Sequence, residues 1–230
     1  MKKSWKIILA LCLILSLLLS LCACGDDEDA PKVYSGNGVC GDYKYRYYTD
    51  GTADITKYEG MDAKVDIPAK LDGHPVTVIG ELAFANNKDI TAVTIPEGVT
   101  HIGAEAFCEC KSLTTVMIPK SVVYIGMGAF NECKSITFVT IPSRVTSIEP
   151  RTFDYCISIT GIIIPDGVTS IGADAFRDCK SLITVTVPKS VTSIGEGAFS
   201  GCSNLTLTIQ RDNCAEQYCK DNGLAYRYPD

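Results

Sequence analysis

The sequence has few of the side chains on which enzyme catalysis depends. Its 230 residues include only two histidines, His74 and His101. Neither belongs to a Gly-x-Ser-x-Gly or His-Glu-x-x-His pattern, and nucleophilic catalysis needs a nucleophile, a base and an orienting group within mutual reach. We therefore expect no enzyme, and we interpret both histidines as solvent-facing loop or edge residues.

An excess of positive charge is also missing. The chain has 21 lysines and arginines against 27 acidic residues. Lys2, Lys3 and Lys6 precede position 24, so the remainder of the chain has 18 against 27 and a net charge near −9. Nucleic-acid binding depends on clustered lysine and arginine, and we expect no nucleic-acid partner.

Twelve cysteines are present, but none has the Cys-x2-Cys spacing of zinc sites. Five of them recur at one constant interval: Cys110, Cys133, Cys156, Cys179 and Cys202. This period arranges thiols along a line and does not bring four ligands to one ion. We expect no metal site and no cofactor, and we interpret the row as buried free thiols. A disulfide between adjacent coils remains an alternative, because strands about 4.8 Å apart are close enough for one to form.

The glycines of residues 36–41 match Gly-x-Gly-x-x-Gly. Dinucleotide binding needs this loop between a strand and a long helix, whereas here it precedes a tyrosine-rich strand pattern. We interpret the segment as a linker or a cap loop.

A secretory signal is expected at the N-terminus. Three lysines precede an apolar run over residues 7–21, which is short for a membrane span of roughly 17–25 residues. Residues 21–24, Leu-Cys-Ala-Cys, resemble the lipobox of bacterial lipoproteins, with Cys22 as a mild departure. The resemblance implies removal of residues 1–23 and lipid attachment at Cys24. An uncleaved anchor and cleavage without lipidation remain alternatives, and all three place the rest of the chain outside the cytoplasm.

A 23-residue repeat dominates residues 65–209. One row of the repeat consists of Phe84, Phe107, Phe130, Phe153, Phe176 and Phe199. A second row consists of Ile79, Ile102, Ile125, Ile148, Ile171 and Ile194. Because so short a unit cannot enclose a core, each copy must bury its apolar side against its neighbours. The sequence therefore predicts a β-rich repeat solenoid of six stacked coils.

One unit shows how a coil is built. Val116 and Ile118 alternate with Met117, which is the period-2 pattern of a strand with Met117 facing outward. Pro119 ends that strand because it has no backbone N–H to continue the pairing. We expect a short helical turn over residues 129–133.

The pattern Leu-x-x-Val-x-Ile-Pro-x-x-Val-x-x-Ile-Gly-x-x-Ala-Phe-x-x-Cys over residues 113–133 resembles the BspA-like leucine-rich repeats of bacterial surface proteins. The resemblance covers roughly residues 65–209. It implies binding to other proteins, and some members of the family act as adhesins for host matrix proteins such as fibronectin or fibrinogen. The fourth repeat departs from the pattern with Glu149-Pro150 in place of the usual glycine, which leaves its turn geometry open.

Both ends of the stack need caps. We expect an acidic tether over residues 24–39 and a hairpin cap over residues 40–64. The alternating tyrosines of residues 43–48 and the following Asp50-Gly51 turn predict the hairpin.

A second cap is expected over residues 210–230. Residues 214–222 are predicted to form a helix, with Asn213 starting a capping box and Gly223 as the stop signal.

The outward face of the stacked strands is the candidate binding site. Met117, Phe138 and Ile163 would lie on adjacent coils and form an apolar patch, and such patches often mark binding sites. The predicted face consists of Thr94, Thr115, Met117, Phe138, Thr140, Ile163, Thr184 and Thr186. Alternatives are that a loop or the tether covers the patch, or that the register is shifted by one. The tyrosine-rich hairpin at residues 43–48 is a second candidate.

The leading hypothesis is a lipid-anchored recognition module at the extracellular face of the membrane, possessing no catalytic activity. Its partner would be a host matrix protein or a bacterial surface protein. A structural envelope scaffold or a glycan-binding spacer is the alternative.

Overall fold

The computed structural model describes residues 32–229. The chain divides into two compact units, Met1–Lys32 and Val33–Asp230, and the described residues make up nearly all of the second. The predicted signal peptide, Cys24 and the first part of the tether lie outside the described residues. Within residues 32–229 no helix is both long enough and apolar enough to cross a membrane.

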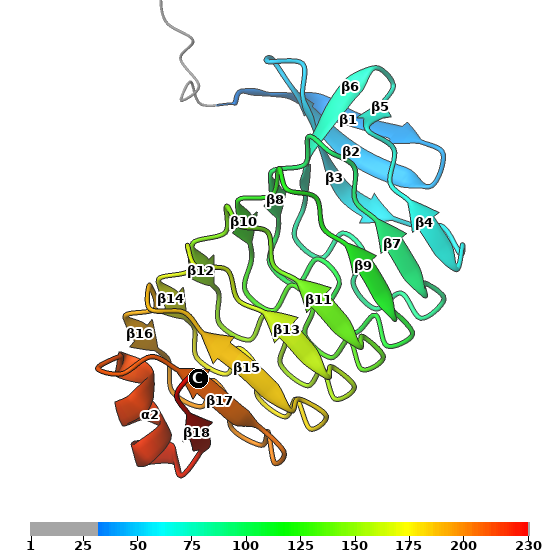
Figure 1. Ribbon diagram of the computed structural model, residues 1–230. Coiled ribbons are helices and arrows are strands. Elements are labelled where there is room, and N and C mark those ends of the chain that lie inside the picture. Colours follow the sequence, from blue (N-terminus) through cyan, green and yellow to red (C-terminus); the bar gives the residue numbers. More distant parts are fainter. Residues whose placement is uncertain (1–31, 230) are drawn as a thin grey trace, which may run out of the picture. The chain divides into compact units, whose positions relative to one another are not determined.

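Each coil of the second unit contributes two short parallel strands, so two rows of strands run along the stack (Figure 1). The first row consists of β4 (Lys64–Asp66), β7 (Ala92–Thr94), β9 (Thr115–Met117), β11 (Phe138–Thr140), β13 (Gly161–Ile163), β15 (Thr184–Val187) and β17 (Thr206–Ile209). The second row consists of β6 (His74–Ile79), β8 (His101–Ile102), β10 (Tyr124–Ile125), β12 (Ser147–Ile148), β14 (Ser170–Ile171) and β16 (Ser193–Ile194). Like residues pair across coils, as Ile79 with Ile102 and Ile102 with Ile125. The predicted stack of matching coils is confirmed.

The phenylalanine row forms one continuous column inside the stack. Phe107 and Phe130 stack with ring centroids 5.4 Å apart, and Phe130 and Phe153 with centroids 5.6 Å apart. All six rings are buried. Burial of one such side chain contributes about 1.5–3 kcal/mol, so the column is a main source of stability. The coils are numbered one to six in the order of these residues, so that coil one contains Phe84 and coil six contains Phe199.

The third side of each coil, here called the turn face, is formed by turns such as residues 127–132 of coil three. It contains no helix among the described residues, so the prediction of a helical turn over residues 129–133 is wrong. The Phe130 N–H donates to Thr152 O of the next coil at 2.9 Å, while Ala129 N–H closes a turn onto Gly126 O at 3.1 Å. Glu132 has φ of 57°, in the left-handed region, which interrupts any helix. Backbone groups here therefore bond alternately within a coil and to the neighbouring coil.

The N-terminal cap is a small antiparallel sheet of β1 (Tyr34–Cys40), β2 (Tyr43–Tyr48) and β3 (Ala53–Tyr58). β3 pairs in parallel with β6, which joins the cap to the second row, and β5 (Lys70–Leu71) pairs antiparallel with the first residues of β6. The predicted hairpin is confirmed.

The predicted tether extends too far into the cap, because residues 34–39 belong to β1. Gly36 and Gly38 allow the strand to lie against the rings of Tyr47 and Tyr45, where a Cβ atom would collide with them. The Gly-x-Gly-x-x-Gly segment is thus part of a cap strand and of the turn that follows.

The C-terminal cap contains the predicted helix, α2 (Cys214–Asn222). The Asn213 side chain accepts a hydrogen bond from the Ala215 N–H, and Gly223 ends the helix with φ of 64°. A further strand that the sequence did not predict, β18 (Ala225–Arg227), pairs with β17 and extends the first row.

Candidate binding face on the first strand row

The strand face is the outward side of β7, β9, β11, β13 and β15. Met117, Phe138 and Ile163 are 61%, 50% and 56% exposed, respectively. Their neighbours Val116 and Val139 are buried. The predicted inward and outward register is therefore correct, and no described segment covers the three apolar side chains.

The other predicted residues lie on the same face. Thr115, Thr140, Thr184 and Thr186 are exposed, and Thr94 is half-buried. Together with the apolar residues they give a face without a charged side chain. The sequence reasoning missed Ile183, which is 60% exposed beside β15. It occupies a row that holds threonine in four preceding coils, so comparison along that row could have identified it.

Phe138 is the centre of this face. Its ring lies against Gly161 of the next coil, where a Cβ atom would be 3.6 Å from Phe138 Cδ2. Two hollows lie on either side of the ring. One of about 340 Å³ is lined by residues 114–118, Thr137, Phe138 and Thr140. The other, of about 240 Å³, is lined by Phe138, residues 161–164, Thr184 and Thr186.

The first hollow coincides with a break in the strand rows. One sheet ends at β9 and another begins at β11, and the second row is likewise divided between β10 and β12. The turn face continues across this boundary, with Gly128 N–H bonded to Pro150 O at 3.0 Å. Coils three and four are therefore joined along the turn face and parted along both strand rows.

The unusual residue of the fourth repeat explains the break. In coils two and three, Gly103 and Gly126 lie so close to the preceding coil that a Cβ would be 2.6 Å from a backbone nitrogen. Their N–H groups donate to Ile79 O and Ile102 O at 2.7 and 2.8 Å. Glu149 occupies the corresponding place in coil four, and among the described residues its N–H makes no such bond. Its Cβ prevents the close approach, which answers the question left open by the sequence.

The cysteine row has a structural role. Cys110 and Cys133 are fully buried, and their thiols donate to Phe84 O at 3.2 Å and Phe107 O at 3.1 Å, one coil earlier. Burial raises the pKa of Cys110 to about 12 and raises the pKa of Cys133 as well. All nine described cysteines are free thiols. This arrangement agrees with buried thiols that satisfy backbone carbonyl groups.

The two histidines lie apart. His74 stacks on Tyr47 with ring centroids 4.8 Å apart, and its Nδ1 lies 2.9 Å from Gly51 O. The interpretation of His74 as solvent-facing is therefore wrong, because it packs half-buried in the N-terminal cap. His101 is exposed on β8, as expected. In residues 32–229 no three histidine, cysteine or acidic side chains gather to hold a metal ion.

The tyrosine-rich hairpin, the second candidate, packs mainly inward. Tyr45 is only 3% exposed, and its hydroxyl donates to Asp72 Oδ2 at 2.7 Å. Tyr43 packs against Tyr58 with ring centroids 5.1 Å apart. These rings form the core of the cap and leave little surface for a partner.

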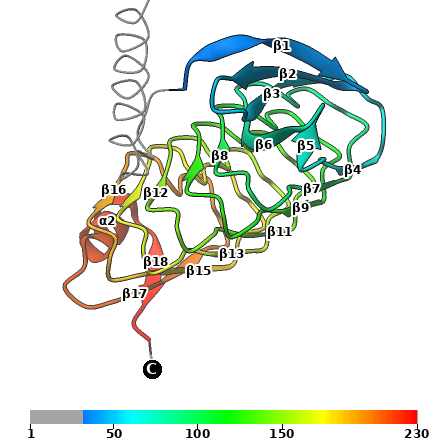
Figure 2. The same ribbon diagram turned by 90° about the horizontal axis from the view of Figure 1, so that it is seen from above.

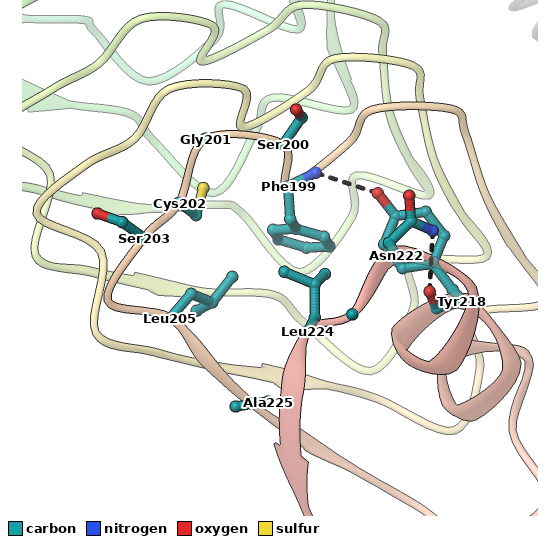
Figure 3. A pocket seen from close by; sticks show the side chains of 11 residues that line it. Phe199, Ser200, Gly201, Cys202, Ser203, Leu205, Tyr218, Asn222, Leu224 and Ala225 are labelled. Carbon is teal, nitrogen blue, oxygen red and sulfur yellow. Dashed lines mark hydrogen bonds between the residues drawn. The ribbon is translucent and has the colours of Figure 1, made fainter.

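Figure 3 shows a further pocket, of about 390 Å³, between coil six and the C-terminal cap. Phe199, Leu205 and Leu224 line it, and the Tyr218 hydroxyl accepts a hydrogen bond from Phe199 N–H at 3.2 Å. The next phenylalanine of the column would fall at Asn222, one repeat length after Phe199. The pocket is therefore a space left where the regular column ends.

The repeated strands, the stacked phenylalanines and the thiol row define a leucine-rich-repeat solenoid. Six copies of the BspA type leucine-rich repeat region match residues 77–206, and the chain belongs to this family. A search of curated proteins found no match.

Solved structures share the fold. A leucine-rich repeat protein of T. pallidum is 26% identical, with a TM-score of 0.73 over 83% of this chain and 97% of that one. A leucine rich cell surface protein of Faecalibacterium prausnitzii is 34% identical, with a TM-score of 0.63, over 80% of this chain and 56% of that one. The family and the fold are consistent with a protein-interaction module.

Proposed function

We propose that this chain is a cell-surface recognition module that binds another protein through the strand face. The observation that carries the proposal is the exposure of Met117, Phe138 and Ile163 on three adjacent coils. Burying one such side chain in an interface removes apolar surface from water and contributes about 1.5–3 kcal/mol. The hollows beside Phe138 offer places for apolar side chains of a partner.

Display at the cell surface would follow from the N-terminal segment. The lysine-rich start, the apolar run and the resemblance to a lipobox support export and lipid attachment at Cys24. The F. prausnitzii relative is described as a cell surface protein, which agrees with this location. A Cys24→Ser variant should be released into the medium, whereas a Cys22→Ser variant should remain with the membrane.

The partner class follows from the surface itself. The strand face has apolar and threonine side chains and no charge, so it suits an apolar protein patch and gives no reason to expect a polyanion. Host matrix proteins and bacterial surface proteins are the candidates, in keeping with an adhesin role. A glycan-binding spacer is the second candidate, because the exposed threonines could bond sugar hydroxyls around Phe138.

Binding measurements on residues 25–230 test the proposal. Met117→Asp and Phe138→Ser should each weaken binding to a matrix protein such as fibronectin at least tenfold, or about 1.4 kcal/mol. Met127→Asp is the matched control, because Met127 is 50% exposed on the turn face, away from the strand face. Binding that responds equally to all three changes, or to none, would reject the strand face as the site.

A further inference from the structure

β1 is the outer strand of a seven-stranded sheet, in which six strands follow the order β1-β2-β3-β6-β8-β10 and β5 pairs with β6 off this path. Figure 2 shows it at the upper margin of the N-terminal cap, with β2 and then β3 below it. Within residues 32–229 nothing pairs with its outer edge. An edge strand presents a row of N–H and C=O groups that can pair with another strand.

This edge has little protection against such pairing. Natural proteins protect free edges with short strands, charged side chains or proline. β4 is three residues long and contains Lys64 and Asp66, and β18 is three residues long and contains Arg227 with Pro229 soon after. β1 has seven residues, Tyr-Ser-Gly-Asn-Gly-Val-Cys, without charge or proline.

Apolar side chains flank the same edge. Val33, Tyr34 and Val39 are 57%, 56% and 66% exposed, respectively. A bulge lies between Tyr34 and Gly36, and pairing with β2 is regular from Gly36 to Cys40. The regular part of the strand is therefore available for pairing on its other side.

The two faces of β1 are suited to a continuous sheet. On the inner side, Gly36 and Gly38 have no side chains, and the rings of Tyr47 and Tyr45 cover them. On the outer side, Asn37 and Val39 are exposed. An uncharged strand can lie beside a second copy of itself without like-charge repulsion, and the Asn37 amide can both donate and accept hydrogen bonds there.

We propose that β1 pairs antiparallel with β1 of a second copy of this chain, joining the two caps into one sheet. The contact is a single pair of strands, well below the roughly 1,600 Å² of a standard interface. The dimer should therefore be reversible, and confinement of copies on one surface would favour it. The proposal does not depend on the strand face or on its partner.

Analytical ultracentrifugation of residues 25–230, which include the whole compact unit Val33–Asp230, tests the proposal. We expect the fraction of dimer to rise between about 1 μM and 1 mM, the range of weak association. Asn37→Lys and Val39→Lys should each lower that fraction at least tenfold, because lysine on an edge strand opposes pairing. Thr115→Lys adds the same charge on the strand face and should leave the dimer unchanged.

Amide hydrogen exchange gives a second readout. Those amides of residues 36–40 that point away from β2 should gain protection as the concentration rises, and the amides of the exposed strand β9 should not. A monomer at every concentration would overturn the proposal. So would a dimer that persists in both lysine variants of β1, or one that Thr115→Lys or Phe138→Ser disrupts, since that would place the contact elsewhere.

Discussion

At the scale of single residues, the turn face depends on an unusual backbone conformation. The turn face of each coil has two residues with positive φ, and most of them are not glycine. They are Leu82, Asn86, Glu105, Glu109, Gly128, Glu132, Arg151, Tyr155, Asp174, Asp178, Gly197 and Gly201. Left-handed φ costs an ordinary L-residue roughly 1–2 kcal/mol, so inter-coil hydrogen bonds and the buried phenylalanines must offset it.

The buried thiols predict how stability changes with pH. Burial raises the pKa of Cys110 to about 12 and raises the pKa values of Cys133 and Cys156. In the unfolded chain these thiols should ionise near pH 8.5. A group with a raised pKa in the folded state stabilises the fold fully below its unfolded pKa, and that stability is lost as pH rises toward the folded pKa.

The free energy of unfolding, measured with urea, should therefore fall between about pH 8.5 and pH 11. Each such thiol can contribute up to about 1.4 kcal/mol per pH unit. A Cys133→Ala variant should show a shallower fall than the parent protein, because one of the thiols is missing. Equal slopes for the two proteins would show that the thiols do not control this loss of stability.

At the scale of elements, the ends of the stack are closed by aromatic side chains. Tyr58 stacks on Phe84 with ring centroids 5.1 Å apart, and Tyr218 meets Phe199 edge to face at 6.2 Å. The Tyr218 hydroxyl also accepts a hydrogen bond from the N–H of Phe199, the last residue of the column, at 3.2 Å. The C-terminal cap therefore replaces the hydrogen bond that a further coil would have accepted.

Tyr218→Phe should keep the packing and remove this bond. We expect a loss of about 1–2 kcal/mol in the free energy of unfolding, because a backbone N–H is left without its partner. Tyr226→Phe is the control, since within the described part of the chain the structure assigns no hydrogen bond to the Tyr226 hydroxyl. Thermal and urea denaturation measure both, and an equal effect of the two changes would exclude a special role for Tyr218.

The elements predicted from sequence are those with a repeating or capping signal. Strands of the first row follow from the alternation around Met117, and α2 follows from Asn213 and Gly223. β1 was missed because Gly36-Asn37-Gly38 is typical of a linker, and its strand conformation depends on the tyrosines opposite. The left-handed turn residues were missed because residues such as Glu132 and Arg151 give no local indication of that conformation.

The candidate site was predictable in part for the same reason. The outward position of Met117, Phe138 and Ile163 follows from period-2 alternation once the repeat is aligned. The hollow beside Phe138 does not follow from this alternation, because it depends on Glu149 at a distant corner of the coil. Outside this site, on the turn face, the buried Asp154 bonds Arg177 Nη2 at 2.7 Å. No other repeat has an acidic residue at this position, so the repeat pattern does not predict it.

At the scale of the whole stack, Glu149 separates two groups of coils. Glu149→Gly should allow coil four to approach coil three, so that residue 149 donates to Ile125 O as glycine does elsewhere. Amide exchange at residues 137–140 should slow, and the hollow between β9 and β11 should shrink. The reverse change, Gly126→Glu, should part coils two and three and lower the free energy of unfolding by about 2 kcal/mol or more.

A control variant separates the effect of Glu149→Gly on amide exchange from general destabilisation. Glu97→Gly changes the same residue type away from the coil boundary and should not slow exchange at residues 137–140. If Glu149→Gly leaves that exchange unchanged, the Cβ of Glu149 does not hold the coils apart.

The hydrogen bonds between coils also give the turn face a net dipole along the stack. Phe84, Phe107 and Phe130 all donate their N–H to the coil that follows, whereas bonds along the first strand row run both ways, as Thr114 to Thr91 and Ile95 to Met117. Aligned peptide dipoles add along an axis, as they do in a helix, while alternating ones cancel. The turn face is therefore partially positive at the end of coil six, where the N–H groups of Gly197 and Gly201 bond to no other described coil, and partially negative at the opposite end.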